Sequence, residues 1–210
     1  MEILGPFLVD LLKVMSPYLL LLVLVLIFKK HLVNLLPGVR SLSFGPVKIE
    51  LFREQLSKIT KKRGIKLSRS DAASPFVRAE AIKPVLQNSS VLWIDDNNPD
   101  NNAEEIDMMK SLGVQVTAVT SSTEAEEFLS RHYYDVIISD IDRAGSPTEG
   151  IDFLGRLVGT TKFHCTIFYV THIDTTKPIP AHAFALTNRP NDLLHFLMDA
   201  LERERWSTVS

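Results

Sequence analysis

Three aspartates end two strand-like runs, and their type and spacing suit the chemistry of a metal ion or a phosphoryl group. Asp95 and Asp96 stand side by side at the end of the apolar run VLWID, and Asp140 ends the run VIISD. Carboxylates that meet with no fixed counter-charge repel one another, and a hard divalent cation such as Mg2+ relieves the repulsion. One of the carboxylates can then attack a phosphoryl donor.

Strand-like and helix-like patterns alternate around these aspartates. Short apolar runs, typical of buried parallel strands, occupy residues 91–95, 114–119, 136–140, 166–171 and 184–187. Amphipathic spacing predicts helices at residues 103–112, 123–130, 151–158 and 191–205. Strands that alternate with helices in this way predict an α/β fold with a doubly wound, five-stranded parallel sheet.

The crevice of such a sheet explains where the aspartates stand. In a doubly wound sheet the ligand site lies outside the carboxyl ends of the strands, at the point where the strand order reverses. Asp95 and Asp96 end the first strand and Asp140 ends the third. We therefore expect the three carboxylates to meet in one crevice.

The order of the motifs resembles the response-regulator receiver family over residues 90–206. The acid pair follows the first strand, a lone aspartate ends the third, Thr171 ends the fourth, and Arg189-Pro190 follows the fifth. Each motif alone is common by chance, so the resemblance depends on all four in order on the expected elements.

The resemblance implies a role for each of these residues. Asp140 is the implied phosphoacceptor, with Thr171 and Arg189 contacting the phosphoryl group. The implied Mg2+ ligands are Asp95, Asp96, Asp140 and Asp142, the last through its backbone carbonyl. Because no nucleophile–base pair stands out, we do not expect an enzyme.

The chain also departs from the family pattern. Arg189 replaces the usual lysine, and its planar head changes the geometry at a phosphoryl group. His172 stands where a small residue normally admits phosphodonors, and Leu186 replaces the aromatic switch residue. Only the stretch HIDTTKPIPAH separates the last two strands, and Pro178 and Pro180 argue against a full helix there. We expect the fourth helix to be missing or reduced to a turn.

The N-terminal segment predicts a membrane anchor. Residues 7–28 read FLVDLLKVMSPYLLLLVLVLIF, and a helix of this length extends about 33 Å, enough to cross the hydrocarbon core. Two alternatives are a cleaved signal peptide, which lacks its basic start and its cleavage site here, and a helix buried in a soluble core. Lys29 and Lys30 follow the span, so the positive-inside rule puts the rest of the chain in the cytoplasm.

The segment after the anchor divides into short pieces. Residues 41–52 alternate around Gly45-Pro46 and are interpreted as a small hairpin. Residues 53–63 form a predicted basic helix whose charges are either solvated or set against anionic lipid, and residues 65–74 are interpreted as a linker. We therefore divide the chain into an anchor, a juxtamembrane segment and a receiver-like domain, at residues 1–31, 32–75 and 76–210.

Composition narrows the class of protein. The chain has 210 residues, 45% of them hydrophobic, and a net charge of -2, which argues against a disordered chain. No strongly basic domain stands out, so nucleic acid is not an expected partner. Cys165 is the only cysteine, which fits a reducing compartment.

Two functions stay open. The first is a membrane-anchored receiver-like signalling protein, with an Asp phosphoacceptor and Mg2+ in a phosphorelay. The second is a phosphorylation-silent interaction or effector module that acts at the membrane in a bacterial stress or phage-conflict system. The expected partners are the membrane, a histidine kinase or downstream effector, and a second copy of the chain in a homodimer.

Overall fold

The computed structural model of the chain describes residues 45–96, 101–160 and 164–209. The predicted anchor, residues 7–28, lies outside these ranges. Within them, no helix combines the length and the apolar character that crossing a membrane requires. The chain divides into two compact units, residues 1–48 and residues 49–210, and the second contains the fold described below.

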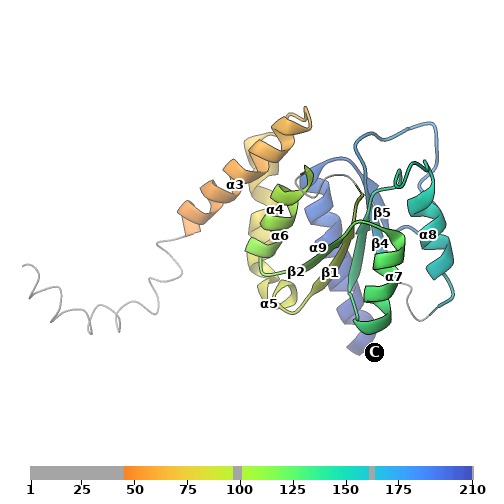
Figure 1. Cartoon of the computed structure of the whole chain (residues 1–210). Coiled ribbons are helices and arrows are strands. Elements are labelled where there is room, and N and C mark those ends of the chain that lie inside the picture. Colours follow the sequence, from red (N-terminus) through yellow and green to blue (C-terminus); the bar gives the residue numbers. More distant parts are fainter. Residues whose placement is uncertain (1–44, 97–100, 161–163, 210) are drawn as a thin grey trace, which may run out of the picture. The chain divides into compact units, whose positions relative to one another are not determined.

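A parallel sheet of five strands forms the centre of this second unit (Figure 1). Its strands are β1 Ser90–Ile94, β2 Gln115–Val119, β3 Val136–Ser139, β4 Cys165–Tyr169 and β5 Ala185–Thr187. Their spatial order is β2-β1-β3-β4-β5, and every neighbouring pair is parallel. The order reverses between β1 and β3, which makes this a doubly wound sheet with its switch point beside β1. The predicted α/β class and strand number are confirmed.

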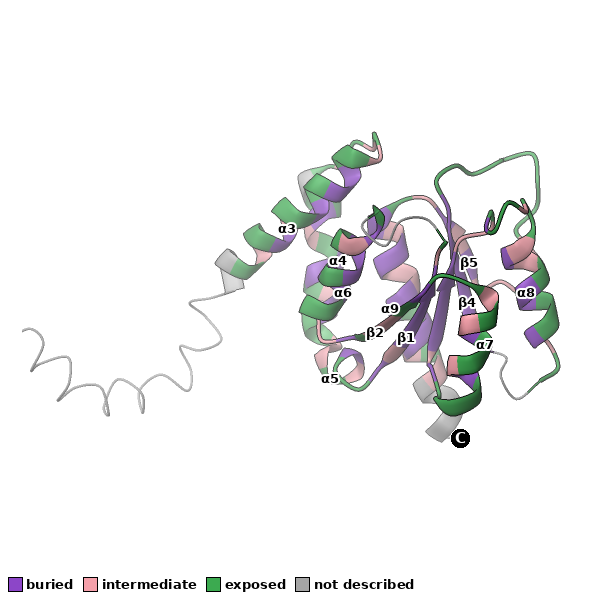
Figure 2. Cartoon of the chain, viewed as in Figure 1, coloured by how far each residue is buried: buried purple, intermediate pink, exposed green. Residues whose placement is uncertain are grey.

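Helices cover both faces of the sheet (Figure 1). They are α6 Ala103–Ser111 and α9 Pro190–Val209 on one face, and α7 Ser122–Arg131 and α8 Glu149–Leu157 on the other. Alternate side chains of β1 point to opposite faces of the sheet. Val91 and Trp93 pack in the cluster with α6 and α9, and Leu92 and Ile94 pack in the cluster with α7 and α8. Figure 2 shows the buried strands between helices whose outer faces are exposed.

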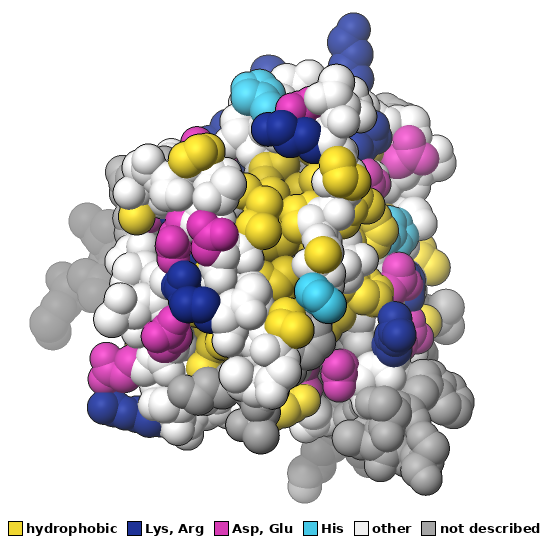
Figure 3. Space-filling model, turned by 90° about the vertical axis from the view of Figure 1, so that its right-hand side faces the viewer, with side chains coloured by type: hydrophobic (Ala, Val, Ile, Leu, Met, Phe, Trp, Pro, Cys, Tyr) yellow, Lys and Arg dark blue, Asp and Glu magenta, His cyan; other side chains and the backbone are white. Residues whose placement is uncertain are grey.

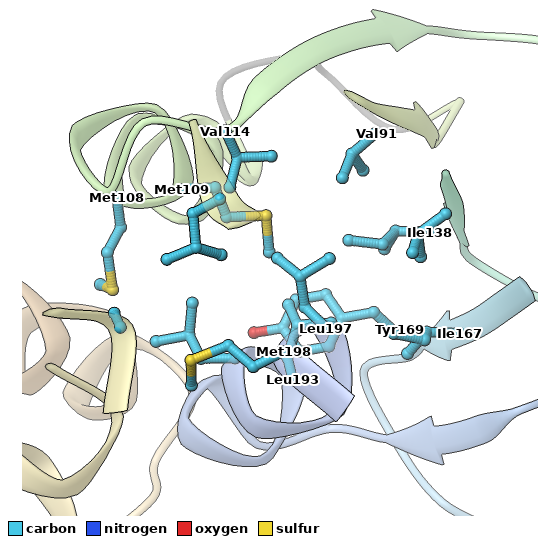
Figure 4. Packing of buried hydrophobic residues seen from close by; sticks show 14 of the residues in the cluster. Val91, Met108, Met109, Val114, Ile138, Ile167, Tyr169, Leu193, Leu197 and Met198 are labelled. Atoms are coloured by element: carbon cyan, nitrogen blue, oxygen red, sulfur yellow. The ribbon is translucent and has the colours of Figure 1, made fainter. Parts of the chain in front are cut away.

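The larger core lies between the sheet and α9. Figure 4 shows side chains that converge from α6, from the sheet and from α9, among them Met108, Met109, Val91, Ile138, Ile167, Leu193 and Leu197. All of these side chains are buried. Buried apolar area contributes about 25 cal/mol per Å2, so this cluster is a main source of the domain's stability.

In the described part of the chain, three helices precede the sheet, and they correct the predicted hairpin. They are α3 Gly45–Lys62, α4 Arg69–Ala81 and α5 Lys83–Leu86. The hairpin over residues 41–52 is wrong in its described part, because α3 begins at Gly45. Pro46 lies in the first turn of the helix, where a missing N–H leaves no helical hydrogen bond unmade.

Helix α3 packs against the same core as the sheet. Phe52, Leu56 and Ile59 recur at helical spacing and are almost fully buried in the large cluster. The Phe52 and Phe76 rings lie 5.3 Å apart, which joins α3 to α4. The predicted linker is also partly helical, since Ser68 caps α4 by accepting a hydrogen bond from the Asp71 N–H at 3.1 Å.

The fourth helix of the predicted pattern is missing. Residues 171–184, all of them described, contain no helix between β4 and β5. An apolar cluster on this side of the sheet consists of the buried Phe168, Leu154 and Val170, with the partly exposed Ile151 and Leu186 packed against it. Figure 3, which faces this side of the molecule, shows a strip of hydrophobic side chains between polar margins.

Candidate functional site

The predicted acids gather at the carboxyl edge of the sheet. The backbone N–H of Asp95 donates to Val119 O, and that of Asp140 donates to Ile94 O, each at 3.1 Å, so both residues continue the strand ladder. A pocket of about 810 Å3 opens at this edge. Its wall includes Asp96, Asp140, Asp142, Thr171 and His172. The structure thus brings most of the predicted site residues to one pocket.

Asp140 occupies the inner wall of the pocket. Its carboxylate accepts a hydrogen bond from the Ile141 N–H at 2.7 Å. Burial raises the pKa of Asp140 from 3.8 to about 6, against the opposing backbone hydrogen bonds of Ile141 and Asp142, and the Asp95 charge adds to the rise. The carboxylate is therefore largely ionised at neutral pH, although its surroundings disfavour the charge.

The two acids after β1 have hydrogen-bond partners from neighbouring loops. The Asn102 side-chain amide donates to Asp95, and the backbone N–H of Ala144 donates to Asp96. Asn102 is buried, so its amide fixes one acid from the start of α6. The turn after β3 fixes the other acid, Asp96, through the Ala144 N–H.

A buried arginine lies beside these acids. The Arg143 side chain is only 2% exposed, and its Nε donates to the backbone carbonyl of Asp140 at 3.0 Å. Its guanidinium carbon lies 5.6 Å from the centroid of the Phe153 ring. Burial lowers the pKa of Arg143, while the charges of Glu149, Asp96 and Asp140 raise it. Among the described residues, its two Nη atoms have no hydrogen-bond partner.

A tight turn positions this arginine. The backbone N–H of Arg143 donates to Ser146 O at 3.1 Å, and the Ser146 N–H returns to Arg143 O at 2.9 Å. Ala144 and Gly145 between them adopt positive φ angles of 54° and 72°. The same turn presents the Ala144 N–H to the acid pair.

Helix α8 begins directly behind Asp140. The Gly150 N–H donates to Ile141 O at 2.9 Å, and a Cβ on Gly150 would lie only 2.3 Å from the Asp140 carbonyl oxygen. No larger residue fits there without a shift of the backbone. Glycine at this position thus sets the distance between α8 and the acid-bearing loop.

The acids of the pocket offer a donor set that suits Mg2+. Carboxylate oxygens are the ligands that this hard cation prefers. Yet no three Asp, Glu, His or Cys side chains in the described part of the chain are arranged to hold a metal ion. The prediction also assumed no fixed counter-charge, but the buried Arg143 lies close by, with its Nε bonded to the backbone carbonyl of Asp140. Mg2+ is usually held by one or two carboxylates together with water, so Asp96 and Asp140 remain suitable ligands for it.

The remaining predicted residues divide between the pocket and its surroundings. Thr171 and His172 are exposed and line the pocket, with Leu186 at its apolar side. Arg189 is not among the lining residues, and its Nε lies 3.4 Å from a carboxylate oxygen of Asp192. The structure therefore brings Thr171 to the acids and directs Arg189 to its own helix.

A second polar cluster connects α3 to the edge of this site. Arg63 donates to the Glu105 carboxylate at 3.1 Å, to the Asn102 side-chain oxygen at 3.0 Å and to Val170 O at 3.2 Å. Its guanidinium carbon also lies 4.0 Å from the Tyr169 ring centroid. The Tyr169 hydroxyl donates to Glu105 at 3.0 Å, and burial, followed by the Glu105 charge, raises the Tyr169 pKa.

The sequence did not point to Arg143 or Asn102. Arg143 follows the third-strand aspartate by three residues in a Gly-containing loop, so proximity along the chain was an available signal. Asn102 ends the run DDNNPDNN, which indicates a turn but not which asparagine reaches back to the acids.

Comparison with known proteins agrees with the observed strand order. No family model and no curated protein matches the chain. Among solved structures, it is similar to the signal receiver domain of a putative LuxO repressor protein from Vibrio parahaemolyticus, with 16% identity and a TM-score of 0.51 over 58% of this chain and 95% of that one.

Two other similar structures are receivers by their names. One is the chemotaxis response regulator CheY4 of Vibrio cholerae, with 20% identity and a TM-score of 0.46 over 53% of this chain and 98% of that one. The other is the response regulator TrrA from Thermotoga maritima in complex with Mg2+-BeF, with 16% identity and a TM-score of 0.47 over 53% and 98%. The domain described above has the response-regulator receiver fold.

Proposed function

We propose that this domain is a signalling module of the two-component type, in which Asp140 accepts a phosphoryl group. The observation that carries the proposal is the position of the Asp140 carboxylate, at the switch point of a receiver fold and on the wall of an open pocket of about 810 Å3. Its partners in this proposal are a histidine kinase and a downstream effector.

The proposed step needs no proton transfer at Asp140. An ionised carboxylate oxygen attacks the phosphorus of a donor such as acetyl phosphate, and a P–O bond to Asp140 forms. The bond between phosphorus and the acetate oxygen breaks, and acetate leaves with its electron pair. In this proposal the hydroxyl of Thr171, which lines the same pocket, donates to a phosphoryl oxygen.

Intact-mass measurement of the full-length protein after treatment with acetyl phosphate tests this step. Wild type is expected to gain one phosphoryl group and Asp140→Asn none. Asp174→Asn is the matched control, because Asp174 lies on the same pocket wall but is exposed. Equal labelling of Asp140→Asn and wild type would contradict the assignment.

A second candidate is a phosphorylation-silent interaction module, and two observations favour it. His172 stands at the pocket wall, and Arg189 pairs with Asp192 instead of lining the pocket. In-line attack requires the donor phosphorus within about 3.5 Å of the carboxylate oxygen, and an imidazole at the rim obstructs that approach. Labelling that appears only in His172→Ala indicates a blocked entrance, and labelling absent from both proteins supports the silent module.

We also propose that residues 1–31 anchor the protein in a membrane, with the receiver-fold domain in the cytoplasm. The support is the apolar run at residues 7–28 and the basic pair Lys29 and Lys30 after it. The full-length protein is expected to sediment with membranes, and the variant without residues 1–31 to stay in the supernatant. Full-length protein in the supernatant after lysis without detergent would refute the anchor.

A further inference from the structure

Arg143 is a buried cation whose presence the proposed phosphoryl chemistry does not by itself require. We propose that Arg143 is the resident counter-charge of the acidic pocket, supplying part of the positive charge that a divalent cation would otherwise provide and weakening Mg2+ binding there. This inference rests on the proposed function only for the role of Asp140, since the charge balance of the pocket is a property of the folded protein.

Burial is the first argument for this role. Removing a guanidinium from water is costly, and a buried cation is retained where negative charges offset that cost. Arg143 is 2% exposed, while the nearby Arg156 is 48% exposed and pairs with Glu149 and Glu126 at the surface. Of these two arginines, only Arg143 is buried, and its Nη atoms have no hydrogen-bond partner among the described residues, so only nearby charge offsets their burial.

Attachment to the acid-bearing backbone is the second argument. The Nε of Arg143 donates to the carbonyl of Asp140, and the turn that holds Arg143 gives its next N–H to Asp96. The acids and the arginine therefore belong to one folded unit. A metal ion can leave the pocket, whereas this positive charge stays as long as the turn is formed.

The charges that act on Arg143 complete the case. The Nε of Arg143 lies 3.0 Å from the Asp140 carbonyl oxygen, and the N–H of the next residue donates to Asp96, so the guanidinium lies near both pocket acids. Mg2+ in the pocket would share these same acids with the guanidinium and would be repelled by it. Removal of the guanidinium charge should therefore leave the acids a stronger cation site.

The experiment is Mg2+ titration of the full-length protein, followed by calorimetry, for wild type, Arg143→Met, Arg143→Lys and Arg156→Met. Methionine keeps an unbranched apolar side chain, and the Arg156 variant loses a guanidinium that lies 5.6 Å from the same Phe153 ring. We expect Arg143→Met to bind Mg2+ roughly tenfold or more tightly than wild type. Arg143→Lys and Arg156→Met should stay near the wild-type affinity.

The outcomes separate this inference from the phosphoacceptor proposal. Unchanged or weaker Mg2+ binding by folded Arg143→Met overturns the inference, whether or not acetyl phosphate labels the protein. If Arg143→Met does not fold, Arg143→Lys decides, because tenfold tighter binding by this charge-retaining variant also overturns it. If labelling by acetyl phosphate is absent but Arg143→Met gains affinity, the counter-charge is supported and the phosphoacceptor proposal fails alone.

Discussion

Replacing Asp140 by asparagine removes a charge that the fold holds at a cost, so Asp140→Asn is expected to stabilise the protein above pH 6. Burial raises the pKa of this carboxyl from 3.8 to about 6. The folded state therefore binds the Asp140 proton more tightly than the unfolded state. By linkage, the ionised carboxylate lowers the free energy of unfolding, and this penalty reaches its full size above about pH 6. It disappears as the pH falls below about 4, where the carboxyl is protonated in both states.

The magnitude follows from the same values. A shift of about two pKa units corresponds to about 3 kcal/mol at 1.36 kcal/mol per unit. Asp140 is partly open to the pocket, so solvent screening reduces the expected gain to about 1–2 kcal/mol. For a protein of this size, each kcal/mol changes the melting temperature by about 2–4 °C.

Thermal unfolding followed by intrinsic fluorescence measures the effect at pH 7.5 and at pH 4. At the higher pH, Asp140→Asn should melt several degrees above wild type, and near pH 4 the two should converge. Asp107→Asn on the exposed side of α6 is the control and should match wild type at both values. A destabilised Asp140→Asn at pH 7.5, or a gain that grows toward pH 4, would refute the reasoning.

Two further predictions compare matched pairs of variants. Gly150→Ala puts a Cβ 2.3 Å from the Asp140 carbonyl oxygen and should cost more than about 2 kcal/mol, whereas Gly155→Ala on the same helix meets no atom within 4 Å and should be neutral or stabilising by about 0.5–1 kcal/mol. Denaturation that shows equal effects would contradict the close approach of α8. Arg63→Met leaves the buried Glu105 charge without its partner and should cost about 3–5 kcal/mol, while Arg53→Met removes an exposed pair and should cost less than about 1 kcal/mol. A similar, small loss in both variants would show that the Arg63 cluster adds little stability.

The sheet could be predicted from sequence because its central strands are almost fully buried. Runs such as VLWI and VIIS are apolar on both faces, and that pattern distinguishes a central parallel strand from a half-exposed one. The proline pair in the segment after β4 likewise allowed the missing fourth helix to be predicted. These features are local, so one sequence contains them.

Helix α3 was missed because one local signal concealed another. Gly45-Pro46 suggested a turn, and the alternation around it suggested strands, although proline is equally suited to the first turn of a helix. The spacing of Phe52, Leu56 and Ile59 was the better indicator, and it becomes decisive only when these side chains have a core to pack against.

The electrostatics of the site could not be predicted in the same way. That Arg143 is buried depends on a turn with two positive φ angles and on the Phe153 ring, ten residues further along the chain. A basic residue in a loop is ordinarily solvated, so its type alone gives no reason to place it under the acids. A buried arginine beside the acids was therefore not predicted from the sequence.

The hydrogen bond between Arg63 and Val170 O has a consequence for synthesis of the protein. The two residues are 107 positions apart, so a ribosome that adds about 5–20 residues per second makes the acceptor roughly 5–20 s after the donor. During that interval helices α3 and α4 have been made, yet β4 and α9, whose side chains belong to the same core cluster, do not exist. The apolar stripe of Phe52, Leu56 and Ile59 then has only α4, through Phe76, to cover it, and the rest of its cluster is absent. The nascent chain therefore presents this stripe to chaperones until its last strands and helix have been translated.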